Sequence, residues 1–102
     1  MQADIVHHFS DGLYAKETII PKDSILVQHK HAFSHLSVLA KGSVLVMVDD
    51  EVTEYQAPAC INIVAGKNHG VKALEDSVWY CIHATEETDV NKIDEVLIKE
   101  GV

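Results

Sequence analysis

Three of the seven histidines in this chain, His29, His31 and His35, fall within a window of seven residues. His29 and His31 are two apart in a segment typical of a β-strand, so their side chains are expected on one face. His35 follows a bend expected at residues 32–34, and His69 follows a glycine-containing turn. Imidazole nitrogen binds Zn, Cu, Fe and Ni and, less selectively, Mn. The pattern therefore predicts one divalent transition metal (Mn, Fe, Ni, Zn or Cu) bound by His29, His31, His35 and His69.

Other groups that could do chemistry are weaker candidates. His7 and His8 are adjacent, so they point to opposite faces of a strand, and we expect neither to bind the metal. The acidic residues gather in expected turns and at a helix start, which is typical of solvated surface. Ser34 and His35 lack a third group that would orient a nucleophile–base pair. The metal site is therefore the only chemistry that the residue types favour.

Short β-runs separated by turn residues occupy the chain up to about residue 84. The expected strands are Ile5–Phe9, Leu13–Ile20, Ile25–His31, His35–Leu39, Ser43–Val48, Val52–Tyr55, Ala59–Val64, a strand that opens at His69, and Ser77–His83. Val44–Val48 is apolar at every position, so we expect it to be buried on both faces. From about residue 89 to 100 the apolar spacing changes to that of a short helix. The pattern predicts an all-β fold with a C-terminal α-helix.

Composition limits the possible classes of function. The chain has 102 residues, 8 basic and 16 acidic, which gives a net charge of −8 and fits one domain. Such an acidic chain should repel nucleic acid, and no apolar run is long enough for a membrane span. The N-terminal residues lack the features of a signal peptide, so a cytoplasmic protein is expected. Cys60 and Cys81 are then expected to be free thiols.

Two segments resemble the motifs of the cupin superfamily. Gln28–His35, followed by six residues and Gly42, is similar to the first motif, in which H-x-H precedes a glutamate and then a glycine. Val64–His69 is similar to the second motif, P-x-G-x-x-H. The resemblance covers about residues 12–84. It implies a cupin-type double-stranded β-helix, or jelly-roll barrel, over about 5–84 and a helix over about 89–100, in one domain spanning residues 1–102.

The departures from the motifs bear on turns and on chemistry. Asp23 and Pro58 stand where glycines are usual, and Val64 stands where proline is usual. His35 replaces the glutamate, as in small cupins whose metal site consists of four histidines. Four neutral ligands leave the full charge on the metal, and a six-coordinate metal keeps two open positions. A tetrahedral Zn would instead be saturated by the same four ligands, and the site would be structural.

In cupins the last strand crosses the barrel, which makes Ser77–His83 a source of interior residues. One face of this strand carries Trp79, Cys81 and His83, and the other carries Val78, Tyr80 and Ile82. If the first face points inward, Cys81 and His83 lie near the metal and Trp79 forms an apolar wall. If the second does, His83 lies on the surface. A metal cavity can satisfy polar atoms, which favours the first. Phe33 and Met47 are further candidates for the wall, or plain core.

The resemblance leaves several functions open. Four imidazoles bring no carboxylate, and no acid–base group is securely placed, so we expect a metal-dependent enzyme of oxygenase type. All eight basic residues are lysines, which favours a small, mostly apolar, oxygen-containing substrate over a phosphorylated one. The alternatives are a non-catalytic binding or sensing module with a structural metal, and a sugar or organic-acid isomerase or lyase. Apolar edge strands predict a homodimer. The resemblance to small cupins, which typically form homodimers, implies the same.

Overall fold

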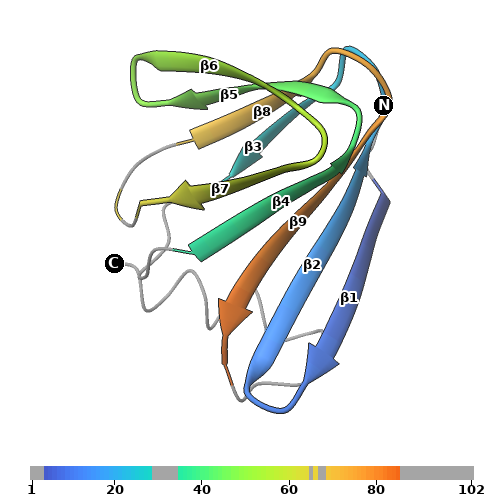
Figure 1. Cartoon of the computed structure of the whole chain (residues 1–102), viewed down its shortest axis with the longest axis vertical. Coiled ribbons are helices and arrows are strands. Elements are labelled where there is room, and N and C mark those ends of the chain that lie inside the picture. The colour runs from blue at the N-terminus through green and yellow to red at the C-terminus, as the bar shows by residue number, and fades with distance from the viewer. Residues whose placement is uncertain (1–3, 29–34, 65, 67–68, 86–102) are drawn as a thin grey trace.

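The computed structural model describes residues 4–28, 35–64, 66 and 69–85 of the chain (Figure 1). Nine strands make up its regular structure. They are β1 (Asp4–Ser10), β2 (Leu13–Ile20), β3 (Ile25–Gln28), β4 (His35–Lys41), β5 (Ser43–Val48), β6 (Glu51–Gln56), β7 (Ala59–Ile63), β8 (His69–Ala73) and β9 (Ser77–Ala84). All nine expected strands are confirmed, although the expected β3 ran on to His31. The helix expected at 89–100 lies outside the described residues, and the described ones contain no helix that could span a membrane.

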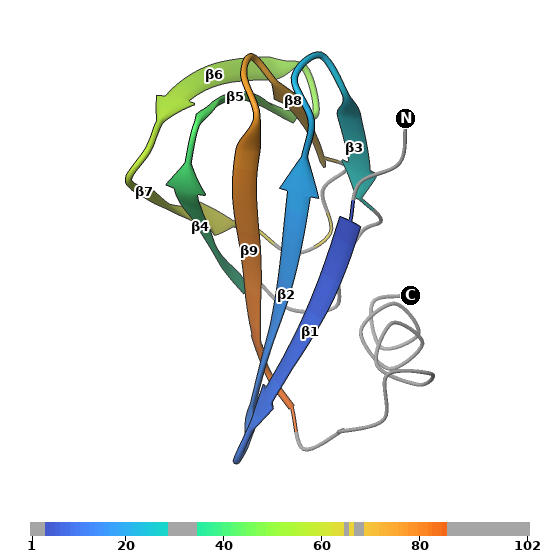
Figure 2. The ribbon, with the colours of Figure 1, turned by 90° about the vertical axis from the view of Figure 1, so that its right-hand side faces the viewer.

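The strands form two antiparallel sheets. A five-stranded sheet has the order β1-β2-β9-β4-β7, and a four-stranded sheet has the order β3-β8-β5-β6. Figure 2 shows that the five-stranded sheet runs the length of the molecule, and we call it the longer sheet. The four-stranded sheet, the shorter sheet, packs against its upper part. Strand β9 lies in the middle of the longer sheet, paired with β2 on one side and β4 on the other. This arrangement is the all-β architecture that the sequence predicts.

The core fills the space between the two sheets, because one face of each inner strand is apolar. In β5, Val44 and Val46 are buried, whereas Leu45 and Met47 on the opposite face are only half-buried. The expectation that β5 is buried on both faces is therefore wrong for its outer face. The buried apolar cluster draws on both sheets, with Ile20, Leu39, Ile61, Ile63, Trp79 and Cys81 from one and Val44, Val46, Val71 and Ala73 from the other.

Five described residues adopt a left-handed backbone: Gly12, Asp23, Gly42, Asp49 and Gly66. Gly42 joins β4 to β5 with φ of 94°, and a Cβ there would lie 2.6 Å from the Asp76 carbonyl oxygen and would also clash with Ser77 Oγ. Only glycine fits, since an added methyl group would have to displace backbone. Asp23 and Asp49 have φ of 70° and 51°. Aspartate tolerates this region better than most residues, so Asp23 serves in a turn where the cupin pattern has glycine.

Candidate metal centre

His35 and His69 approach each other from the two facing sheets. His35 opens β4 in the five-stranded sheet, and His69 opens β8 in the four-stranded sheet. Each shares a face with buried core residues two and four positions along its strand, and each is at most 5% exposed. Their ring centroids lie 6.0 Å apart. The fold thus brings together two histidines that are 34 positions apart in the sequence (69 − 35).

The separation of these two rings fits a shared metal. Metal–nitrogen bonds to histidine are about 2 Å long, so two rings on one metal have centroids at most about 6.5 Å apart. The observed 6.0 Å lies within that limit. Both Nε2 atoms are buried, and neutral imidazole in a dry interior is a suitable donor for a transition metal. The distance is therefore compatible with a shared metal, and the role of His35 and His69 as ligands stays a prediction.

His29 and His31, the other two predicted ligands, lie outside the described residues. The face of β3 to which the sequence pattern assigns them points outward, because Ile25 and Val27 are 58% and 78% exposed. The described part of β3 therefore does not support an inward position for that face. Over residues 4–28, 35–64, 66 and 69–85, no group of three or more histidine, cysteine or acidic side chains is placed to hold a metal. A site with three or more such ligands would therefore include residues outside the described ones, as the prediction for His29 and His31 requires.

His83 lies directly against His35, on the neighbouring strand. The β4–β9 register pairs Leu36 with Ile82, and one further step along it sets the two histidines side by side. Their ring centroids are 4.4 Å apart with an interplanar angle of 31°, and His83 is buried. His83 is thus the buried neighbour of a predicted ligand, and its expected role beside the metal stays a prediction. We call His35, His69 and His83 the histidine cluster.

The orientation of β9, which the sequence left open, is now determined. Trp79, Cys81 and His83 are buried between the sheets, whereas the alternate residues are half-buried on the outer face. Ser37 Oγ donates a hydrogen bond to Cys81 Sγ over 3.6 Å, one residue pair deeper than the histidine cluster. Trp79 is fully buried, and its Nε1 has no hydrogen-bond partner within the described part of the chain. These residues form an apolar floor below the histidine cluster.

Met47 and Phe33 are the other two residues that we expected in the cavity wall. Met47 lies on the outer face of β5, where its methyl group would lie 3.3 Å from a Cβ added to Gly70. Because Met47 alternates with the buried Val46, it does not line the space between the sheets, and its predicted place in the wall has no support. Phe33 lies outside the described residues.

A cavity of about 240 Å³ opens at the edge of the two sheets, between β6 and β7. Its lining combines apolar and polar side chains: Val46, Val48, Glu51, Thr53, Tyr55, Ile61, Asn62 and Val64. Val48 pairs with His69, and Ile63, beside the lining residues, pairs with His35. The cavity therefore begins next to the histidine cluster and could hold a small molecule there.

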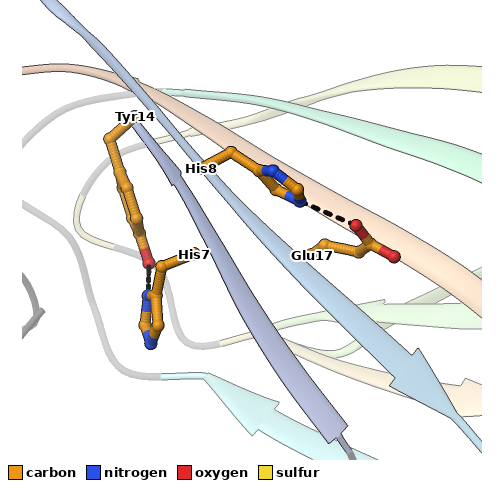
Figure 3. A network of polar contacts seen from close by, with 4 residues as sticks. All are labelled: His7, His8, Tyr14 and Glu17. Carbon is orange, nitrogen blue, oxygen red and sulfur yellow. Dashed lines mark hydrogen bonds and ion pairs between the residues drawn. The ribbon is translucent and has the colours of Figure 1, made fainter. Parts of the chain in front are cut away.

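Tyr14 and His7 form a polar pair that the sequence analysis missed. Tyr14 is fully buried on β2, and its hydroxyl oxygen lies 2.6 Å from Nδ1 of His7 on β1 (Figure 3). His8, on the other face of β1, contacts Glu17 instead at 2.8 Å. The Asp11–Gly12 turn could have revealed the pair, because counting back from it sets Phe9 opposite Tyr14 and His7 two residues further, on the same face as Phe9.

Solved structures of similar fold identify the architecture. A cupin superfamily protein from Desulfitobacterium hafniense matches with a TM-score of 0.73 at 13% identity, over 81% of this chain and 77% of that protein. KdgF from a Halomonas species matches with a TM-score of 0.68 at 22% identity, over 86% and 80%. Salicylate 1,2-dioxygenase from Pseudoaminobacter salicylatoxidans matches with a TM-score of 0.71 at 9% identity, over 78% and 24%.

The chain has a cupin fold. No family model and no curated protein sequence matches it. At these identities the similarity establishes the cupin fold alone, because one fold carries many unrelated activities. The function of this cupin must be argued from its histidine cluster and its cavity.

Proposed function

We propose that this cupin is a metal-dependent enzyme of oxygenase type, with one divalent transition metal held by His29, His31, His35 and His69. The observation that carries the proposal is the approach of buried His35 and His69 from opposite sheets, with 6.0 Å between their rings. When bound, the metal would act as a Lewis acid that activates an oxygen-containing substrate or dioxygen at its open positions. A salicylate dioxygenase stands among the proteins of similar fold.

The chain's own residues would bind and shield the substrate. Val46, Val48 and Ile61 supply an apolar wall to the cavity, while Thr53 and Asn62 offer hydrogen-bonding groups at its rim. Burial of Trp79 and Cys81 below the histidine cluster keeps water out of the floor. This mixture suits a small, mostly apolar molecule with one or two oxygen atoms, and the absence of arginine from the sequence disfavours phosphorylated substrates.

His83 favours a second candidate, a sugar or organic-acid isomerase or lyase. Such enzymes need a group that moves a proton beside the metal. His83 is buried with its ring 4.4 Å from that of His35, which supports this candidate if His35 binds the metal. Tyr80, a second group on this strand that could move a proton, lies on the outer face of β9. The placement of His83 weakens the sequence-based argument against proton transfer.

Metal analysis followed by turnover assays separates the candidates. The chain would be purified without an affinity tag that binds metal, analysed for metal, stripped, and reloaded with Fe, Mn or Cu. Small phenols and diketones would then be supplied with and without dioxygen. Metal-dependent oxygen uptake that is lost in His69→Ala supports the oxygenase. Turnover of hydroxy-carbonyl substrates without oxygen uptake supports the isomerase. A metal that is bound without either activity indicates a binding or sensing module, and a chain that takes up no metal contradicts the proposal.

A further inference from the structure

Tyr14 is a fully buried phenol with a base next to it. It lies on β2 with no exposed surface, and its hydroxyl oxygen is 2.6 Å from Nδ1 of His7. His7 lies on β1, the edge strand of the longer sheet, and its ring is only partly buried. When Nε2 of His7 carries the imidazole proton, Nδ1 accepts the hydrogen bond that Tyr14 donates. The pair thus links a buried hydroxyl to the edge of the molecule (Figure 3).

Aromatic contacts continue from this pair to the histidine cluster. The rings of His7 and Tyr14 have centroids 5.8 Å apart, and those of Tyr14 and His83 lie 6.3 Å apart. His83 is in turn 4.4 Å from His35. The register explains the row, because Tyr14 pairs with His83 across β2 and β9, and Phe9 pairs with Tyr14 across β1 and β2. An unbroken series of rings therefore joins a predicted metal ligand to the edge strand.

A base beside the hydroxyl and a row of rings that leads to an oxidant are together what a tyrosine needs in order to be oxidised reversibly. Removal of one electron makes a phenol strongly acidic, so the oxidation is easy only where a base takes the proton at the same time. Water cannot do so for a phenol with no exposed surface, and a hydrogen bond between buried groups is strengthened by the low local dielectric. His7 lies in hydrogen-bond contact and can accept that proton.

We propose that Tyr14 is a redox-active tyrosine that gives an electron to a one-electron oxidant at the histidine cluster while His7 takes up its phenolic proton. The O–H bond of Tyr14 breaks, the oxidant is reduced by one electron, and the products are a neutral Tyr14 radical and a His7 imidazolium. A thiol or ascorbate-type reductant that reaches β1 then returns the electron, and His7 returns the proton. The oxidant is of the class formed from peroxide by redox metals. This source of the oxidant rests on the proposed function, whereas the oxidation of Tyr14 with proton transfer to His7 does not.

In this role the row of rings would protect buried side chains from oxidation. An oxidising equivalent that is not consumed by substrate would otherwise attack the imidazoles of the cluster or buried Cys81, two residues along β9 from His83. Passage to Tyr14 moves it toward the edge strand, where a small reductant can reach it. A structural role alone would make Tyr14 and His7 matter for stability but would give no radical.

The test uses the full chain with zinc or no metal, so its result does not depend on turnover. A photogenerated ruthenium(III) polypyridyl complex supplies the one-electron oxidant, and electron paramagnetic resonance and transient absorption detect the radical. The chain has three tyrosines, so Tyr55→Phe with Tyr80→Phe leaves Tyr14 alone. We expect this double variant to keep most of the wild-type tyrosyl radical yield, and Tyr14→Phe to lose it.

His7→Asn is the decisive variant, because it keeps a hydrogen-bond acceptor near Tyr14 but removes the base. We expect it to slow formation of the radical about 100-fold, the low end of what a positioned base contributes. Added imidazole should restore part of the rate. Far-ultraviolet circular dichroism and thermal melting establish that each variant is folded. An unchanged rate in His7→Asn, a tyrosyl radical that persists in Tyr14→Phe, or a tryptophan radical in place of a tyrosyl one overturns the proposal.

Discussion

His83 packs its imidazole against that of His35, with 4.4 Å between the ring centroids, and the two residues come from neighbouring strands of one sheet. We expect the two histidines to have different roles, His35 as a metal ligand and His83 as a neighbour of that ligand. His35 faces His69 across the interior, whereas His83 lies between His35 and Tyr14 in the longer sheet. Substitution of each histidine should therefore affect metal binding differently.

Metal content should distinguish the ligands from their neighbour. We expect His69→Ala to lose its metal on dialysis, because one of four bonds to the metal is gone. His83→Ala should keep the metal with an affinity lowered by about 10–100-fold, as is usual for residues that contact a ligand. Atomic absorption on dialysed protein measures both. Equal retention in the two variants would contradict the assignment of His69 as a ligand.

Core packing predicts a contrast within β4. Leu39 is fully buried, so Leu39→Ala should lower the free energy of unfolding by about 2–5 kcal/mol. Leu36 is 50% exposed on the opposite face of the same strand, and Leu36→Ala should change stability by about 0.5 kcal/mol or less. Urea denaturation followed by tryptophan fluorescence gives both values, since Trp79 is the single tryptophan. Similar losses would mean that the faces of β4 are wrongly assigned.

The turn between β4 and β5 should tolerate nothing larger than glycine. Gly42→Ala has to overcome both positive φ and a clash with the Asp76 carbonyl oxygen and Ser77. Gly66 also has positive φ, 79°, but a Cβ there would meet no atom within 4 Å. Gly66→Ala should therefore cost about 1–2 kcal/mol for the backbone alone. Gly42→Ala should cost roughly 1–3 kcal/mol more. Thermal unfolding of the two variants provides the comparison, and the reverse order would refute it.

Tyr80 should titrate above its ordinary pKa of 10.0, because burial and a hydrogen bond to the Glu17 carboxylate both favour the protonated phenol, as does the carboxylate's negative charge. The folded state then binds this proton more tightly than the unfolded state. Its contribution to stability is present below pH 10 and is lost as the pH rises through the pKa of the folded state. Ultraviolet titration of tyrosinate should show Glu17→Gln lowering the pKa of Tyr80. No change in that variant would exclude Glu17 as a cause.

The edge of the longer sheet predicts a homodimer. Ile5 and Val6, on opposite faces of β1, are 45% and 42% exposed, and Leu13 on β2 is 51% exposed. Edge strands with apolar residues on both faces are usually covered. We expect a twofold dimer in analytical ultracentrifugation at micromolar concentration, weakened by Val6→Lys. Lys16→Glu, on the neighbouring strand, serves as a charge-change control. A monomeric wild-type chain would disprove this expectation.

Alternation of residue types predicted the strands and most of the interior correctly. It failed where the position of a side chain depends on neighbouring strands and not on the pattern of its own strand. Met47 is apolar, but the shorter sheet has a half-buried outer face on which it lies. The contact of Tyr14 with His7 could not come from periodicity, because it depends on the register of β1 and β2, in which Phe9 stands opposite Tyr14. The predicted approach of His35 and His69 rested on the motif resemblance, since spacing alone does not set two sheets face to face.

The central position of β9 has a consequence for biosynthesis. Before residues 77–84 leave the ribosome, β2 and β4 have no strand between them, and the longer sheet exists only as two separate pieces. Pairing of Leu13 with Ala84 closes one of the largest loops in the chain, and such distant contacts make folding slow. The nascent chain should therefore stay open, with Val44, Val46 and Ile61 accessible to chaperones, until its final strand is made.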